Sequence, residues 1–221
     1  MKNKIISKEK AISRIREGMT LMVGGFGLVG SPLELIDELR MQGTGGLTVI
    51  SNNLGEPGKG LDLVLQNGQI KKAIGSYFTS NPNVGIRFAA GELAIELLPQ
   101  GTFSEAIRGG GAGIGGFYTR SAAGTLLADG KETRTIDGET YVFEKTLHAD
   151  VALIRAYRAD TLGNLIYRKT ARNFNPVMAT AADLVIVEVE EIVEPGQLDP
   201  ESIVTPHLYV DYLVRRGRSH D

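Results

Sequence analysis

A glycine-rich segment near the amino terminus has the composition of an anion-binding loop. It follows the apolar run Thr20–Val23, which predicts a buried strand, and it precedes a predicted helix. The helix start is indicated by Ser31 as a cap, Pro32 at the first helical position and Glu34 in a capping box. Glycines lack a Cβ atom and a helix start has unpaired N–H groups, so we expect a phosphate or a thioester to approach this backbone. The candidate binding residues are Gly24, Gly25, Phe26, Gly27, Leu28, Val29 and Gly30.

The same glycines fit the fingerprint of a dinucleotide-binding fold, with Gly25, Gly27 and Gly30 at the required spacing. That interpretation also requires an acidic residue about 20 positions further on, at the end of the second strand, to hold a ribose hydroxyl. The predicted second strand is instead followed by Asn52 and Asn53, which are neutral amides. No Gly-Lys-Ser/Thr sequence follows the glycines either. An NAD-dependent oxidoreductase is therefore one alternative, and a tight turn that binds no ligand is another.

Composition excludes several kinds of site. The chain has 221 residues and no cysteine, which rules out disulfides, thiolate nucleophiles and cysteine metal sites. The three histidines, His148, His207 and His220, are far apart in sequence, and no HExxH-like spacing occurs. We therefore predict no metal site.

The charge and hydropathy patterns argue against nucleic-acid and membrane partners. A formal net charge of −2 gives no electrostatic case for nucleic acid, and the basic cluster of Arg215, Arg216 and Arg218 is expected to be a solvated tail. No apolar run approaches transmembrane length, and residues 1–4 lead into a charged helical pattern rather than a secretory core. We therefore expect a cytoplasmic protein.

Strands and helices alternate along the first half of the sequence with short connections. After the first strand, strands are predicted at residues 47–50, 70–76 and 93–98. Helices are predicted at residues 8–17, 32–41, 61–67 and 103–108. This alternation predicts an α/β fold with an open, largely parallel sheet covered by helices.

The second half of the sequence has a different texture. Residues 109–117 are too glycine-rich for any regular element, and residues 133–143 predict a β-hairpin that turns at Asp137 and Gly138. Further strands are predicted at residues 151–156, 164–167 and 184–189, and a short helix at 175–182. No linker, repeat or low-complexity segment interrupts the chain, so we predict a single domain over residues 1–221 with the hairpin as a small insertion.

Three polar turns are predicted at the same edge of the sheet. The carboxyl ends of parallel strands meet at one edge, and ligands of such sheets bind outside that edge. The turns are residues 24–30, 51–53 and 99–101.

Longer stretches resemble one enzyme family. Residues 17–32, EGMTLMVGGFGLVGSP, resemble the signature of the alpha subunit of family I 3-oxoacid coenzyme A transferases, which include acetate/acetoacetate, succinyl-CoA:3-oxoacid and 3-oxoadipate transferases. Further similar segments are SNN at 51–53, PQGT at 99–102, IR at 107–108, GGAG at 110–113, GT at 124–125, ARNFN at 171–175 and VE at 187–188. The resemblance implies a three-layer α/β/α fold. It also implies a ping-pong reaction, in which an enzyme glutamate attacks an acyl-CoA and an acyl–enzyme anhydride and then an enzyme–CoA thioester follow.

The resemblance also suggests roles for single residues. Asn52 matches an active-site asparagine that can donate to a thioester oxygen, although an asparagine there can equally cap its own turn. Gln100 matches a glutamine that faces the reacting carbonyl, where a neutral donor suits an oxyanion hole. The glycine segment would face coenzyme A. Arg172 could bind a substrate carboxylate, a loop or a partner, and residues 110–116 could form a second wall of the site or a subunit contact.

The nucleophile is not expected on this chain. In the family it belongs to the beta subunit, and the Glu-Asn-Gly or Glu-Ser-Gly turn that surrounds it is absent here. Glu188 and Glu190 alternate on a predicted strand edge, and Glu56 is the one loop carboxylate near the expected ligand edge.

The resemblance therefore implies a CoA-transferase alpha subunit that acts together with a partner, the beta subunit. It would need no metal or redox cofactor and would take coenzyme A as a substrate. The acid is of the acetoacetate, acetate or succinate type, and sequence cues for these conflict. A non-catalytic ligand-binding module on the same fold is the non-enzymatic alternative.

Overall fold

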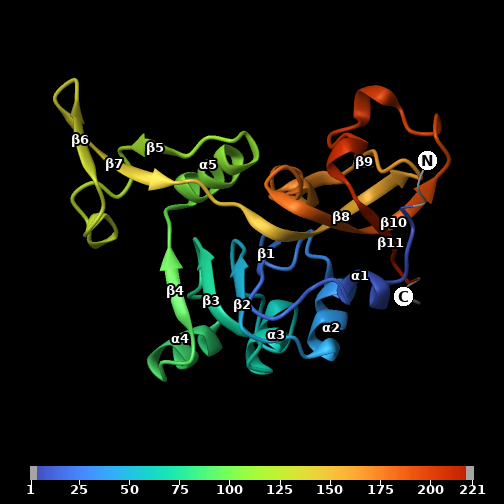
Figure 1. The fold of residues 1–221 in the computed structure, drawn as a ribbon, viewed down its shortest axis with the longest axis horizontal. Helices are drawn as coiled ribbons and strands as arrows, with labels where there is room; N and C mark the ends of the chain where they lie inside the picture. Colours follow the sequence, from blue (N-terminus) through green and yellow to red (C-terminus); the bar gives the residue numbers. More distant parts are fainter. Residues whose placement is uncertain (1–3, 218–221) are drawn as a thin grey trace.

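The computed structural model describes residues 4–217 and contains a large central sheet (Figure 1). The strands of this sheet are β1 (Thr20–Val23), β2 (Leu47–Ile50), β3 (Ile70–Gly75), β4 (Ala94–Leu97), β8 (Ala149–Asp160), β9 (Leu165–Ile166), β10 (Ala182–Val193) and β11 (Tyr212–Arg215). They follow the order β11-β10-β8-β1-β2-β3-β4, and every neighbouring pair in that order is parallel. The short β9 pairs with β8 in the antiparallel sense. The prediction of a largely parallel sheet is confirmed.

Helices cover both faces of the sheet, as predicted. They are α1 (Lys8–Ile12), α2 (Leu33–Gln42), α3 (Leu61–Gln66), α4 (Pro82–Ala89), α5 (Gln100–Gly111) and α6 (Asn175–Ala179). Four short 3₁₀ turns complete the helical segments: η1 (Leu126–Ala128), η2 (Lys169–Arg172), η3 (Pro200–Ser202) and η4 (His207–Tyr209).

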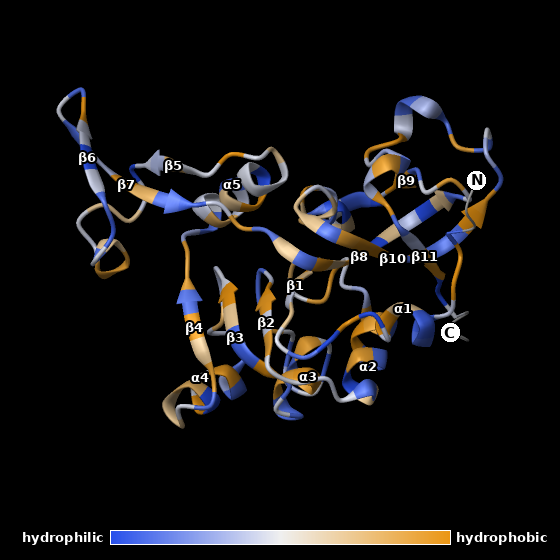
Figure 2. Cartoon of the chain, in the orientation of Figure 1, coloured by the Kyte–Doolittle hydropathy of each residue, from blue (hydrophilic) through white to orange (hydrophobic). Residues whose placement is uncertain are grey.

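Alternating residues of the strands feed two separate hydrophobic cores. Leu21 and Val23 of β1 pack with α1, α2 and α3, whereas Met22 between them packs with α5 and α6 on the opposite face. Figure 2 shows the corresponding distribution, with long hydrophobic stretches on the central strands and mixed hydropathy on the helices. The two cores give the three-layer α/β/α arrangement.

The chain changes direction within the sheet between β1 and β8. The strands β1, β2, β3 and β4 are added in sequence toward one edge, and the chain then returns to place β8 on the other side of β1. Such a topological switch point opens a crevice at the carboxyl ends of the strands, where α/β proteins bind ligands. The glycine segment follows β1, so it lies at this switch point, and the N–H of Gly24 donates to the carbonyl of Leu153 in β8 (2.9 Å).

The prediction that residues 109–117 form no regular element is wrong. Helix α5 continues through Gly111, and a strand begins at Gly116. The structure gives the reason: a Cβ atom on Gly110 would lie 1.8 Å from the carbonyl oxygen of Leu147, and one on Gly111 would lie 2.3 Å from Thr180 Oγ1. These glycines permit close packing of a helix, which glycine content alone does not reveal.

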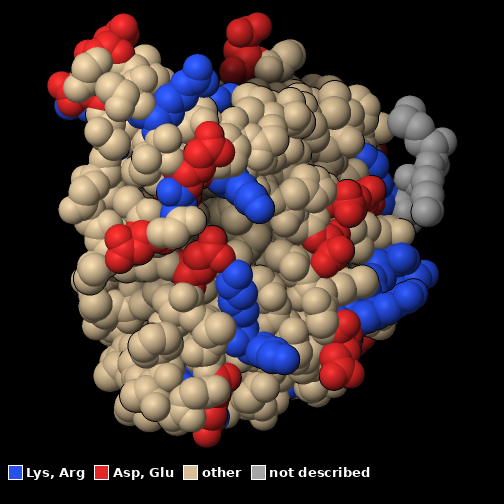
Figure 3. All heavy atoms as spheres, turned by 60° about the vertical axis from the view of Figure 1, so that its left-hand side comes forward, with Lys and Arg blue, Asp and Glu red and all other residues tan. Residues whose placement is uncertain are grey.

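A small antiparallel sheet projects from the body next to β4 (Figure 1). It consists of β5 (Gly116–Thr119), β7 (Glu139–Lys145) and β6 (Thr133–Ile136), and we call it the arm. The predicted hairpin is confirmed, because β6 and β7 are joined at Asp137 and Gly138, which both have positive φ (51° and 81°). The third strand, β5, lies in the stretch predicted to be irregular. Figure 3 brings this side forward and shows acidic and basic side chains interspersed on it.

Several element boundaries differ from the predictions. Helix α1 ends at Ile12 instead of residue 17, α6 ends at Ala179, and β8 and β10 are each 12 residues long. Strand β11 was not predicted. Of the basic cluster, Arg216 is not a solvated tail residue but pairs with carboxylates, as described below, and Arg218 lies outside the described residues, as does His220. No helix within residues 4–217 is long and apolar enough to cross a membrane.

Candidate active site

Three side chains from different strand ends meet in a cluster of neutral hydrogen-bonding groups. The Nδ2 of Asn52, just after β2, donates to Oε1 of Gln100 at the start of α5 and to Oγ of Ser76 after β3, at 2.9 Å each. The Ser76 hydroxyl in turn donates to Gln100 Oε1. Asn52 is buried, whereas the Gln100 residue is exposed to solvent. The structure thus brings Asn52 and Gln100 together, and it adds Ser76, which the sequence analysis did not single out. We call Asn52, Ser76 and Gln100 the amide cluster.

The asparagine that caps the turn is Asn53, not Asn52. The N–H of Gly55 donates to Asn53 Oδ1 (2.8 Å), an i to i+2 side-chain turn typical of asparagine. Asn53 Nδ2 donates to Asn52 Oδ1 (3.1 Å). The side chain of Asn52 is therefore available to the amide cluster.

The glycine segment forms a tight turn of its own. The N–H of Phe26 donates to the carbonyl of Val29 (3.0 Å) and the N–H of Val29 to the carbonyl of Phe26 (3.2 Å). Gly27 lies at the tip with a φ of 61°, and a Cβ atom there would meet nothing within 4 Å. Among the described hydrogen bonds, none uses the N–H of Gly27 or Leu28. The backbone at the tip is therefore open to a ligand, as predicted for this segment.

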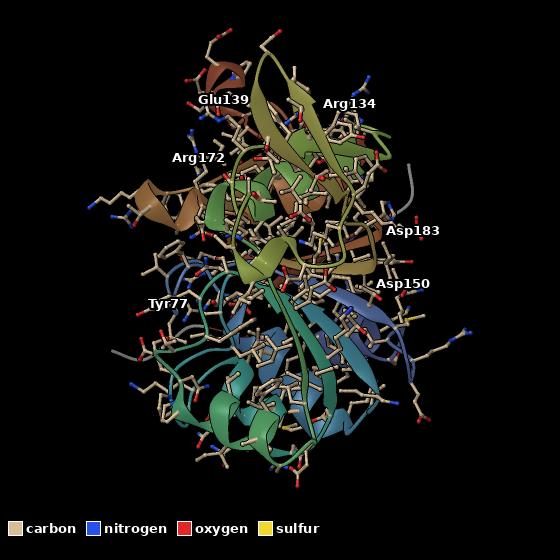
Figure 4. All side chains as sticks on the ribbon, turned by 90° about the vertical axis from the view of Figure 1, so that its left-hand side faces the viewer. Tyr77, Arg134, Glu139, Asp150, Arg172 and Asp183 are labelled. Carbon is tan, nitrogen blue, oxygen red and sulfur yellow. The ribbon has the colours of Figure 1, made fainter. Side chains whose placement is uncertain are left out.

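Two asparagines that the sequence analysis did not single out hold this turn in place. Asn173 Nδ2 donates to the carbonyl of Val29 (3.0 Å), and Asn175 Nδ2 donates to that of Gly30 (3.1 Å). A Cβ atom on Gly24 would lie 2.0 Å from Asn175 Oδ1, so the close approach requires glycine. The ARNFN segment is thus a clamp on the glycine turn. Its Arg172 is exposed and lies on the same side of the molecule as Tyr77, opposite Asp150 and Asp183 (Figure 4).

The start of α2 is not an open anion site, and the predicted capping box is wrong. The N–H groups of Glu34 and Leu35 donate to Oε2 of Glu188 in β10, at 2.8 and 3.2 Å. Ser31 does not cap the helix, because its hydroxyl donates to the Gly27 carbonyl (3.3 Å). The carboxylate of a distant strand occupies the position at which a phosphate would be expected.

Glu188 is completely buried, contrary to its predicted place on a strand edge. Burial disfavours its charged form and raises its pKa to about 7, although the N–H groups of Leu35 and Glu34 favour the carboxylate. Its Oε1 has no hydrogen bond, and the Nε of Arg216 lies 3.7 Å away. Glu188 therefore serves the structure of the helix start and does not face the ligand edge.

An apolar pocket of about 400 Å³ adjoins the amide cluster. Ser76 belongs to both, and Tyr77, at the pocket's rim, has 54% of its surface exposed. The remaining lining is mostly apolar and comes from α4 and the edge strand β4: Phe78, Thr79, Asn81, Pro82, Val84, Gly85, Ile95 and Leu97.

Other predicted candidates lie elsewhere. Glu56 is exposed in a turn closed by a hydrogen bond between the N–H of Lys59 and the carbonyl of Glu56 (2.8 Å). Gly110 is ten residues along α5 from Gln100, about 15 Å at the helical rise, so it forms no wall beside the amide cluster. Within the described residues, no group of three or more His, Cys, Asp or Glu side chains could hold a metal ion.

Comparisons with known proteins agree with this architecture. The sequence model of the coenzyme A transferase family matches residues 5–216. The alpha-type subunit of a probable succinyl-CoA:3-ketoacid coenzyme A transferase of Bacillus subtilis is 53% identical over 96% of this chain and 89% of its own. The alpha subunit of the acetate CoA-transferase of Escherichia coli is 46% identical over 97% of both chains.

The fold recurs in solved structures. An acyl-CoA transferase from Escherichia coli O157:H7, solved as a thioester complex with CoA, matches 97% of this chain with a TM-score of 0.88 at 21% identity. The present chain spans about half of that protein, 47% of its length. An α/β fold with neutral amide donors at its ligand edge is thus shared with acyl-transfer enzymes. The chain belongs to the coenzyme A transferase family.

Proposed function

We propose that this chain is the alpha subunit of a CoA transferase that moves coenzyme A between a short-chain acyl-CoA and a carboxylic acid. The observation that carries the proposal is the near full-length identity with relatives named as the alpha-type subunits of such transferases. The match includes the alpha-type subunit of the 3-oxoadipate CoA-transferase of Pseudomonas putida, at 48% identity. These names cover succinyl-CoA, acetate and 3-oxoadipate reactions, so the acid is identified by assay of a carboxylate panel.

The chemistry of the amide cluster suits one half of such a site. When a carboxylate attacks a thioester, negative charge develops on the carbonyl oxygen, and hydrogen-bond donors aimed at that oxygen stabilise the transition state. Gln100 supplies an exposed amide that stays neutral throughout, so it donates without competing for the proton of a catalytic acid. Asn52 holds it, and the N–H groups at the tip of the glycine turn would bind coenzyme A.

The cluster has donors but no carboxylate nucleophile. Asn52, Asn53, Ser76 and Gln100 are all uncharged, and Glu188 is occupied at the start of α2. We propose that a glutamate from the beta subunit performs the attack on the acyl-CoA, that the anhydride and the enzyme–CoA thioester follow, and that CoA is then passed to the second acid. Each step exchanges one acyl–heteroatom bond for another, so no oxidant or metal is needed.

The apolar pocket beside Ser76 is the proposed site for the acyl group. Its volume of about 400 Å³ and apolar lining fit a short acyl chain whose carbonyl lies at the amide cluster. No observation favours the NAD alternative, because Asn52 and Asn53 bond to each other and to Gln100 rather than offering an acid to a ribose.

Co-expression tests the proposal. The purified chain alone should not exchange CoA between acetoacetyl-CoA and acetate or succinate, and the complex with the beta subunit of its own organism should. Equal activity of the isolated chain, or stabilisation of the chain by NAD but not by acyl-CoA in a thermal melt, would overturn it.

A further inference from the structure

We infer that Asn53 and Ser76 are positioning residues that orient the Gln100 amide with its nitrogen outward, toward the reacting carbonyl. The inference rests on the proposed function and deepens it, because it identifies what sets the polarity of the oxyanion donor. The side chains form a chain of hydrogen bonds that starts at a backbone N–H, and each link permits one orientation.

The chain of bonds begins at Gly55. A backbone N–H can only donate, so the atom of Asn53 that faces it must be the amide oxygen, Oδ1, at 2.8 Å. The amide nitrogen of Asn53 then points the other way and donates to Asn52 Oδ1 at 3.1 Å. An amide cannot present oxygen on both sides, so the first contact fixes the second.

The next links saturate their partners. With its oxygen engaged by Asn53, Asn52 offers Nδ2, whose two hydrogens meet two acceptors, Gln100 Oε1 and Ser76 Oγ, at 2.9 Å each. The Ser76 hydroxyl accepts from Asn52 and donates to Gln100 Oε1. Gln100 Oε1 thus receives two hydrogen bonds, the number its lone pairs accommodate.

The result is an amide of defined direction. Both hydrogens of Gln100 Nε2 are without an acceptor among residues 4–217, and the residue is exposed at the ligand edge. Without the relay the two ends of a glutamine amide are nearly equivalent in shape, and the oxygen could face the developing oxyanion and repel it. The relay removes that orientation before substrate binds, which is the preorganisation that makes such donors effective.

A near-isosteric substitution at the start of the relay tests this inference. In Asn53→Asp the introduced carboxylate still accepts from Gly55 N–H but has no hydrogen to give to Asn52. Asn52 must turn its nitrogen toward the carboxylate, its oxygen then faces Gln100, and Gln100 must turn its nitrogen inward. At about pH 8, where the carboxyl is ionised, kcat of the two-subunit complex should fall about a hundredfold with little change in KM for acyl-CoA.

Ser76 gives a second, milder arm. Ser76→Ala removes one of the two donors to Gln100 Oε1 and should lower kcat several-fold, and Ser76→Thr, which keeps the hydroxyl, should restore it. Asn67→Asp, the same change at an exposed position of the end of α3, should leave kcat unchanged. If Asn53→Asp fails to fold, the Ser76 pair carries the test.

Two readouts separate positioning from a merely structural role. In a Gln100→Ala background, Asn53→Asp and Ser76→Ala should produce no further loss of kcat, because each acts through Gln100. In NMR spectra of the ¹⁵N-labelled chain, Asn53→Asp should shift the side-chain amide signals of Gln100, a result that does not depend on activity. Full additivity of the losses, or an unmoved Gln100 signal, would overturn the inference. An inactive wild-type complex with a shifted Gln100 signal would instead refute the proposed reaction and leave the relay standing.

Discussion

At the residue scale, catalysis by this chain depends on a single uncharged donor. Gln100→Ala in the two-subunit complex removes the proposed oxyanion donor, so kcat should fall by about a hundredfold or more, with a much smaller effect on CoA binding. Steady-state kinetics on both substrates would measure it. Turnover within a factor of about two of the wild type would mean that Gln100 only shapes the loop.

A second prediction at this scale concerns the buried Glu188. Its pKa is raised to about 7 in the folded chain by burial, against an ordinary value of 4.5 for the unfolded chain. The folded state therefore holds the proton more tightly, so the contribution to stability is complete below about pH 4.5 and is lost as the pH rises to about 7. Glu188→Gln keeps an oxygen for the N–H groups of α2 but does not titrate.

The difference between the two proteins isolates this group. As the pH rises from about 4.5 to about 7, the free energy of unfolding of Glu188→Gln should improve relative to wild type by up to about 3 kcal/mol. Urea unfolding across that range would measure it. A difference that does not vary with pH would contradict the raised pKa.

The sequence predicted some site residues and not others for a physical reason. Asn52 and Gln100 were placed at one edge because both follow strands of a parallel sheet, and the structure brings them into contact. Ser76 and Asn175 also follow the sheet or its connections, but their partners lie 24 and 145 residues away, and no local pattern encodes such pairings. Glu188 was misplaced because strand alternation does not show that both faces of β10 are covered.

At the element scale, glycines at the two ends of α5 have opposite roles. A Cβ atom on Gly110 would meet the Leu147 carbonyl, whereas one on Gly101 would meet nothing within 4 Å. Gly110→Ala should therefore lower the free energy of unfolding by about 1–3 kcal/mol, since the helix must move away from residue 147. Gly101→Ala should raise it by up to about 1 kcal/mol through helix propensity. Equal effects in denaturant titrations would contradict the packing argument.

The same comparison explains why the helix could not be predicted. A run of three glycines is a strong signal against a helix interior, and the energetic penalty is real. The close approach of α5 to residues 147 and 180 outweighs it, and that approach is visible only in three dimensions.

Helix α4 offers a test of the acyl pocket. Gly85 lines the pocket, and a Cβ atom there would meet nothing within 4 Å, so Gly85→Leu should fold and fill the space. We expect kcat/KM for longer acyl chains to fall about tenfold relative to the shortest one. Gly85→Ala is the matched control, because it adds helix propensity with little loss of volume. An unchanged chain-length preference would mean that the acyl group binds elsewhere.

At the scale of the whole molecule, the fold was predictable and the division of labour was inferred. Alternating strands and helices predicted the parallel sheet, but its order, with β8 beside β1, depends on a crossover between distant segments. That crossover places the glycine turn at the switch point, next to a strand from the second half of the chain.

The central claim is that this chain holds and polarises the acyl-CoA while a partner subunit supplies the nucleophile. The most direct measurement is to incubate the two-subunit enzyme with acyl-CoA, reduce the enzyme–CoA thioester with borohydride and locate the modified residue by mass spectrometry. The account predicts a modified glutamate on the partner subunit, with none on this chain. A modification at Glu56, or at any other residue of this chain, would contradict it.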